Sequence, residues 1–97
     1  MITEIAVLSI KAGQEAEFEK KVAQAVPHFM ASGGCHGLKL ARCIEDPQQY
    51  HLAVQWESVD HHMVQFRESE HYQKWRDLVG PHFDQAPTVV HVSDVSL

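Results

Sequence analysis

Histidine is the residue type in this sequence that most suggests chemistry, because eight occur among 97 residues. Histidine titrates near neutral pH and can act as an acid, a base or a metal ligand. Several histidines lie among aromatic residues in the second half of the chain. This cluster is typical of either an ordinary aromatic core or a flat apolar pocket that would suit an aromatic ligand. Its members are Trp56, His62, Phe66, Tyr72, Trp75, His82 and Phe83.

The histidines do not have the spacing of a metal site. His61 and His62 are neighbours, and on a helix neighbouring side chains point about 100° apart. The residues four positions after His62 and His71 are Phe66 and Trp75, which are not ligands. Neither HExxH nor CxxC occurs. We therefore expect no specific metal site.

Nucleotide and nucleophile motifs are also missing. The five glycines form neither GxGxxG nor GxxxxGK[ST], and Gly33-Gly34 is typical of a turn. No GxSxG elbow occurs. Ser69 and His71 are two positions apart, so they would not face each other on a helix, and Ser69 is better explained as a helix cap. Glu68 and Glu70 are typical of a solvated helix face.

The first half of the chain predicts a strand, a helix and a hairpin. Residues 2–10 are rich in β-branched and aliphatic types, which favours a strand. From residue 14 the apolar positions recur every three or four residues, which favours a helix that Pro27 should end or kink. Strands over 36–45 and 50–57 would be joined by a turn of 45–49.

The second half predicts another helical region and a last strand. Ser58 can cap a helix over about 59–67, and Ser69 suggests a restart that leads into 72–79. A final strand would cover 88–95. The order βαββαβ predicts one α+β domain over 1–97 of the ferredoxin-like type, with a four-stranded antiparallel sheet and two helices on one face.

The second face of this sheet needs a cover. Its expected residues are Ile5, Val7, Ala53, Val89 and His91, although the alternation does not settle which side each strand presents. Such a face is too apolar to leave as a large wet surface. A second subunit that packs sheet to sheet is the simplest cover, so we expect a homodimer.

Charge and cysteine usage exclude several function classes. Thirteen acidic against eight basic residues give a net charge of -5 with no basic cluster, so we expect no nucleic-acid partner and no membrane surface partner. No apolar stretch is long enough to span a membrane, and the start does not resemble a signal peptide. Cys35 and Cys43 would lie about 26 Å apart on one extended strand, too far for a disulfide. Free thiols favour a cytoplasmic location.

Four parts of the sequence, in order, carry a resemblance to a known family. They are residues 5–8 with 13–15; the turn 45–47 before Tyr50; the set 56–60, 62 and 66–83; and the end 90–92. This ordered set extends over essentially the whole chain and resembles the antibiotic biosynthesis monooxygenases. The resemblance implies a dimeric ferredoxin-like α/β barrel with a pocket between sheet and helices in each subunit.

The resemblance also implies an activity. Several members oxidise polyketide anthrones or quinols with molecular oxygen and use no metal, flavin or haem. A deprotonated, electron-rich phenol can pass an electron to oxygen itself, so such a protein needs a dry cavity, a base and donors for the developing charge. We therefore expect a cofactor-independent monooxygenase for a small aromatic, phenolic or quinol-type substrate, with no cofactor.

Candidate residues follow from the resemblance. His62 and His71 are the best base candidates, and His91 is a third if its side of the last strand faces the pocket. Arg67 or Arg76 would either stabilise an oxyanion or be surface charges. The expected substrate-binding residues, among which Phe66 and Trp75 would sandwich the ring, are Trp56, Phe66, Tyr72, Trp75, Phe83 and His91.

The sequence differs from two branches of this family at the residues that carry their activities, and these differences limit which activity we expect. A haem-degrading branch uses an Asn, Trp and His set, but this chain has no Asn, and Ala6 and Phe66 stand about where the Asn and Trp would fall. Trp75 or Arg76 stands in place of the His, so haem iron would lack its axial imidazole. A quinol-oxidising branch often has a His at the position of Phe66, whereas His71 matches a histidine of that branch. A non-catalytic dimeric ligand-binding or stress-associated barrel, and isomerisation by a histidine base, stay open as alternatives.

Overall fold

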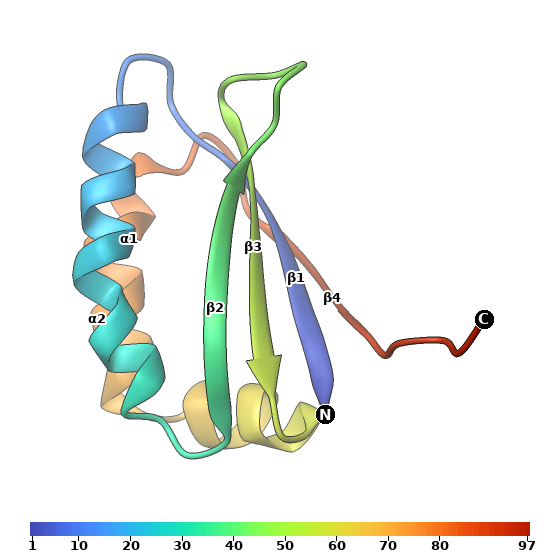
Figure 1. The fold of residues 1–97 in the computed structure, drawn as a ribbon. Coiled ribbons are helices and arrows are strands. Elements are labelled where there is room, and N and C mark those ends of the chain that lie inside the picture. The colour runs from blue at the N-terminus through green and yellow to red at the C-terminus, as the bar shows by residue number, and fades with distance from the viewer.

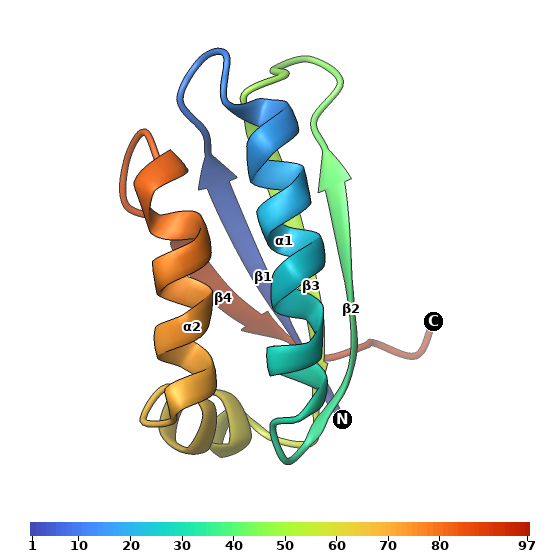
Figure 2. The same ribbon diagram turned by 90° about the vertical axis from the view of Figure 1, so that its left-hand side faces the viewer.

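The computed structural model describes all residues from 1 to 97. It forms an open four-stranded antiparallel sheet in the order β2-β3-β1-β4, with both α-helices on one face (Figures 1 and 2). This is the predicted ferredoxin-like α+β fold. The elements along the chain are β1 (Ile2–Ser9), α1 (Glu15–Met30), β2 (Cys35–Arg42), β3 (Gln49–Trp56), η1 (His61–Phe66), α2 (Glu70–Val79), η2 (Gly80–His82) and β4 (Thr88–Val92).

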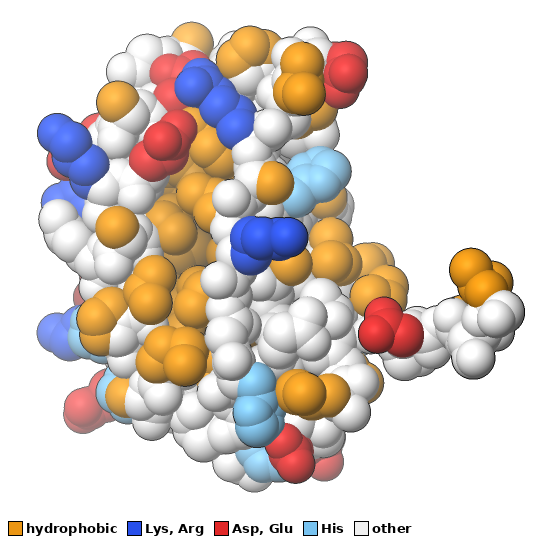
Figure 3. Space-filling view, in the orientation of Figure 1, with side chains coloured by type: hydrophobic (Ala, Val, Ile, Leu, Met, Phe, Trp, Pro, Cys, Tyr) orange, Lys and Arg blue, Asp and Glu red, His pale blue; other side chains and the backbone are white.

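The core lies between the sheet and the helices. On β1 every second side chain is buried, namely Glu4, Ala6 and Leu8, which is the period of a strand with one covered face. Apolar side chains of α1, such as Phe18 and Phe29, pack against this face. Viewed along the β2 edge, apolar side chains fill the space between α1 and the sheet (Figure 3).

The β1–β4 register decides which residues lie on the outer face. Ile5 pairs with Val90, whereas Glu4 pairs with His91 and Ala6 pairs with Val89. Paired residues of neighbouring strands point to the same face. The outer-face prediction was therefore wrong for Val89 and His91, which lie on the helix side. Two adjacent valines give no alternation from which the sequence alone could set this register.

Helix α1 does not end at Pro27 but continues to Met30. The last turn is held by the Ala31 amide, which donates to the Pro27 carbonyl at 2.9 Å. It is also anchored by the buried ring of Phe29, which lies 4.8 Å from the Phe66 ring and 5.0 Å from the Trp75 ring, centre to centre. A proline inside a helix costs about 3 kcal/mol, and burial of Phe29 offsets much of this.

Both predicted serine caps are present. Ser58 accepts from the His61 amide at 3.3 Å, and Ser69 accepts from the Tyr72 amide at 3.4 Å. The segment between them is a π-helix rather than an α-helix, in which the Arg67 amide donates five residues back to the His62 carbonyl at 3.1 Å. Helix α2 begins at Glu70, two residues before the predicted start at residue 72.

Other predicted boundaries differ by a few residues. Strand β4 ends at Val92, because nothing pairs with the chain after that point, and the tail extends away from the domain (Figure 1).

Cys35 and Cys43 are both free, as expected. None of the helices is long and apolar enough to cross a membrane.

Candidate active site

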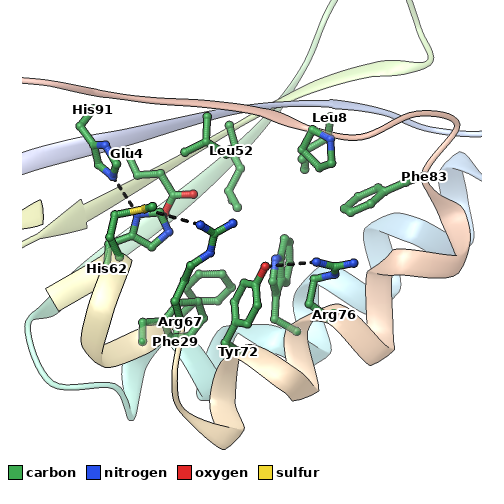
Figure 4. A pocket seen from close by; sticks show the side chains of 16 residues that line it. Glu4, Leu8, Phe29, Leu52, His62, Arg67, Tyr72, Arg76, Phe83 and His91 are labelled. Carbon is green, nitrogen blue, oxygen red and sulfur yellow. Dashed lines mark hydrogen bonds and ion pairs between the residues drawn. The ribbon is translucent and has the colours of Figure 1, made fainter. Parts of the chain in front are cut away.

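A single pocket opens between the helix side of the sheet and the η1–α2 region (Figure 4). Its volume is about 450 Å³, and ten of its 16 lining residues are hydrophobic. Strand β1 contributes Glu4, Ala6 and Leu8 to the wall. A volume in this range holds a small organic molecule, and mostly apolar walls with a few polar groups are typical of a ligand site.

One end of the pocket carries a connected acid–base cluster formed by Glu4, His62 and His91. His62 Nδ1 lies 2.8 Å from His91 Nε2, and His62 Nε2 lies 3.3 Å from Glu4 Oε1. The Trp56 indole N–H donates to the same Glu4 oxygen at 2.9 Å. The register explains this cluster, because Glu4 pairs with His91 on the adjacent strand while η1 places His62 over both.

Two hydrogen bonds and one close contact hold this cluster together. In one assignment of protons, His91 donates from Nε2 to His62 Nδ1, and Trp56 donates to Glu4. His62 Nε2 faces Glu4 Oε1 at 3.3 Å as a close polar contact. Glu4 Oε2 then has no partner within the protein, yet no fully buried polar atom is left unpaired. This oxygen is therefore accessible in the pocket and free to take a proton from a ligand.

Burial sets the ionisation of the cluster. Glu4 is 5% exposed, and burial raises its pKa, partly opposed by the Trp56 hydrogen bond and the charge of Arg67. Burial also lowers the pKa of His62 to about 4, with further lowering by His91 and Arg67. His62 is thus neutral at pH 7, and Glu4 holds a proton more readily than an ordinary carboxylate. A carboxyl group tuned in this way is suited to general base catalysis.

The opposite wall is cationic. Arg67 and Arg76 line the pocket, and their guanidinium carbons lie 5.5 Å and 5.9 Å from the centre of the Tyr72 ring. Arg76 also donates to the Tyr72 hydroxyl at 3.2 Å. Burial alone would raise the pKa of Tyr72, but the hydrogen bonds and charges of the two arginines outweigh it and lower this pKa.

Most of the predicted site residues meet in this pocket. The structure places His62, Phe66, Tyr72, Trp75, Phe83 and His91 on its wall. Trp56 does not line the pocket but lies fully buried behind it, stacked on His62 with ring centres 5.3 Å apart. His71 also lies outside, half-buried, with its ring 5.8 Å from that of His28.

Glu4 is the functional candidate that sequence reasoning missed. It is the only charged residue in the strand Ile2–Ser9, and it shares the parity of the buried Ala6 and Leu8. A lone carboxylate at a core position of a strand was the available indication. No group of three or more His, Cys, Asp or Glu side chains is arranged to hold a metal ion.

Fold and site together define a small ferredoxin-like domain with an apolar pocket and a buried carboxylate–histidine cluster. The family model of antibiotic biosynthesis monooxygenases matches residues 1–78. The uncharacterised protein YczJ of Bacillus subtilis (strain 168) is 39% identical over 95 residues, which cover 98% of this chain and all of YczJ. The chain therefore belongs to the antibiotic biosynthesis monooxygenase family.

Solved structures agree with this assignment. A Bordetella bronchiseptica protein, named as a candidate antibiotic biosynthesis monooxygenase, is 53% identical and superposes with a TM-score of 0.96 over 98% of this chain and 97% of its own. A variant of SnoaB, a cofactor-independent oxygenase from Streptomyces nogalater, is 16% identical, with a TM-score of 0.79 over 99% of this chain and 94% of its own. The second likeness concerns the fold alone.

Proposed function

We propose that this protein is a cofactor-independent monooxygenase that uses molecular oxygen on a small, electron-rich aromatic substrate of the phenol, anthrone or quinol class. The single observation that carries the proposal is the Glu4–His62–His91 cluster at one end of an otherwise apolar cavity. Family membership and the fold shared with a cofactor-independent oxygenase support it.

The first step is removal of a proton from the substrate. In a phenol or quinol this is the hydroxyl proton, and in an anthrone it is a proton of the methylene group opposite the carbonyl, so that a phenolate forms in each case. Glu4 Oε2 takes this proton, because it is the cluster oxygen without a partner. His62 positions Glu4 through the 3.3 Å contact, and His91 positions His62 from the next strand. Arg67, whose charge acts on both Glu4 and His62, stabilises the phenolate that forms.

The second step is reaction of the phenolate with oxygen. The electron-rich ring reduces O₂, one oxygen atom bonds to the ring carbon, and the other leaves as water. For an anthrone, C₁₄H₁₀O and O₂ give the quinone C₁₄H₈O₂ and H₂O, so no further reductant is needed. Phe66, Trp75 and Phe83 flank the ring and exclude water, which protects the reactive intermediate.

Oxygen uptake tests this function. EDTA-treated protein is assayed with anthrones, hydroquinones and catechols, with subtraction of autoxidation. We expect uptake that scales with protein, and a decrease of about 100-fold in His62→Ala. His71→Ala is the matched control, because His71 lies outside the pocket, and it should keep its activity.

Two results would contradict the proposal. If His62→Ala oxidises the substrates as fast as the wild type, the cluster has no part in the reaction. If no substrate is oxidised while aromatic ligands still bind, the protein is the non-catalytic binding barrel instead.

We further propose a homodimer that forms through the outer face of the sheet. Ile5, Val7 and Ala53 lie on this face, and Val90 and Val92 on β4 are 56% and 45% exposed there. A second copy packed sheet to sheet would cover these apolar side chains. The free thiols of Cys35 and Cys43 favour a reducing compartment, so we also propose a cytoplasmic location.

A further inference from the structure

Arg76 is a pocket residue that forms no ion pair with an acidic side chain of the protein. The four ion pairs of the chain join other residues, and none of them includes Arg76 or Arg67. A guanidinium carries five N–H donors, and Arg76 uses one of them, to the Tyr72 hydroxyl at 3.2 Å. The Tyr72 hydroxyl accepts that bond and keeps its own O–H to donate. Four guanidinium donors and one hydroxyl donor therefore remain for a ligand.

The two arginines of the pocket occupy different places. The charge of Arg67 lowers the pKa of both Glu4 and His62, whereas Arg76 donates to the Tyr72 hydroxyl. Figure 4 shows Arg76 near Phe83, at the end of the pocket away from Glu4 and His62, with Arg67 between them. The pocket thus has a carboxylate–histidine end and an arginine–tyrosine end, separated by apolar walls.

The two ends of the pocket differ in their exposure to solvent. Glu4 is only 5% exposed, whereas Arg76 is exposed and lies at the rim of the pocket. A neutral hydroxyl loses less on entering the dry end than a charged group would, and a charged group at the rim keeps part of its hydration. Of the charged residues that line the pocket, two are cationic and one is anionic, although the whole chain carries a net charge of -5.

We propose that the substrate is a hydroxylated aromatic carboxylate, held with its carboxylate on Arg76 and the Tyr72 hydroxyl and with its phenolic hydroxyl at Glu4. The proposal rests on the proposed function for the role of the Glu4 end. Arg76 is then a specificity-determining residue. Planar guanidinium and carboxylate groups pair through two parallel hydrogen bonds, which also fixes the direction in which the ring lies.

Calorimetric titration with 6-hydroxy-2-naphthoate and its methyl ester tests the inference. The acid carries its hydroxyl and carboxylate at opposite ends of two fused rings, and the ester has the same shape without the charge. We expect the acid to bind about tenfold more tightly than the ester. In Arg76→Gln this preference should disappear, while affinity for the ester stays the same.

Lys74→Gln is the matched control. Lys74 lies on the same helix and is exposed, and it does not line the pocket, so its removal changes net charge equally. We expect this variant to keep the preference for the acid. The inference is overturned if the wild type binds the ester as tightly as the acid, if it binds neither, or if Lys74→Gln loses the preference as fully as Arg76→Gln.

The binding test is separate from catalysis, because neither probe has to be oxidised. A protein that prefers the acid through Arg76 but takes up no oxygen would contradict the proposed function alone. A protein that oxidises neutral quinols and shows no preference for the acid would contradict the substrate class alone.

Discussion

At the scale of the residue, the burial of the Glu4 carboxyl group costs the protein free energy. A buried carboxylate loses its hydration, and this loss is why its pKa is raised. The Trp56 N–H and the His62 ring return part of the lost interaction at 2.9 Å and 3.3 Å. Replacing a buried polar pair with apolar residues is often neutral or stabilising. The arrangement is therefore better explained by a chemical role than by stability.

The pH dependence of stability follows from His62, whose pKa is lowered to about 4 from 6.5, chiefly by burial. Between these values the unfolded chain binds more protons at this position than the folded chain. The free energy of unfolding therefore falls as the pH decreases from about 6.5 to about 4, with a slope of at most about 1.4 kcal/mol per pH unit. The raised pKa of Glu4 acts in the opposite direction.

Urea denaturation of the wild type and His62→Gln between pH 4 and pH 7 measures this contribution. The variant should lose less stability than the wild type over the acidic part of this range. Equal slopes in both proteins would show that His62 becomes protonated as easily in the folded state as in the unfolded chain.

At the scale of the element, the turn between α1 and β2 fixes the start of η1. Gly34 has a φ of +84°, and a Cβ atom there would overlap the His61 imidazole. That ring is held in place by Ser58 Oγ, 2.8 Å from His61 Nδ1. The residue after His61 is His62, so the turn, the cap and the π-helix together set the position of the Glu4–His62–His91 cluster.

Gly34→Ala and Gly13→Ala form a matched pair of variants. Both glycines have positive φ, at +84° and +87°, but an added Cβ at Gly13 meets nothing within 4 Å. Gly13→Ala should cost about 1 kcal/mol of stability through backbone strain alone. Gly34→Ala should cost about 1–3 kcal/mol more, because the imidazole must move. Chemical denaturation measures the free energy of unfolding of both variants. Equal losses of stability would mean that the His61 ring moves aside at little cost.

The same elements show how far prediction from sequence reached. The change from period-two to helical periodicity gave the βαββαβ order, and helical spacing brought Phe66, Tyr72 and Trp75 to one wall. The site was harder to predict than the fold, because it depends on the register of the strands and on where the helical segments begin and end. The pairing of Glu4 with His91 is set by the β1–β4 register, and the break between η1 and α2 puts His62 and His71 on different helices. Neither feature has a strong local pattern.

At the scale of the whole molecule, the helices cover one face of the sheet and leave the other to solvent in the single chain (Figure 1). Light scattering coupled to size exclusion should give about twice the chain mass of 11.0 kDa. Val90→Glu, which places a charge in the outer face, should shift the protein toward the monomer. A stable monomer of the wild type at high concentration would contradict packing through this face.

The most direct test of the central claim is oxidation of anthrone under ¹⁸O₂ by metal-free wild type and Glu4→Gln, followed by mass spectrometry. The substitution keeps an oxygen that accepts from Trp56 but removes the base. We predict one ¹⁸O atom in each quinone product, one O₂ consumed per turnover, and a rate about 100-fold lower in the variant. A product without ¹⁸O, or equal rates in the two proteins, would contradict oxygenation driven by this carboxylate.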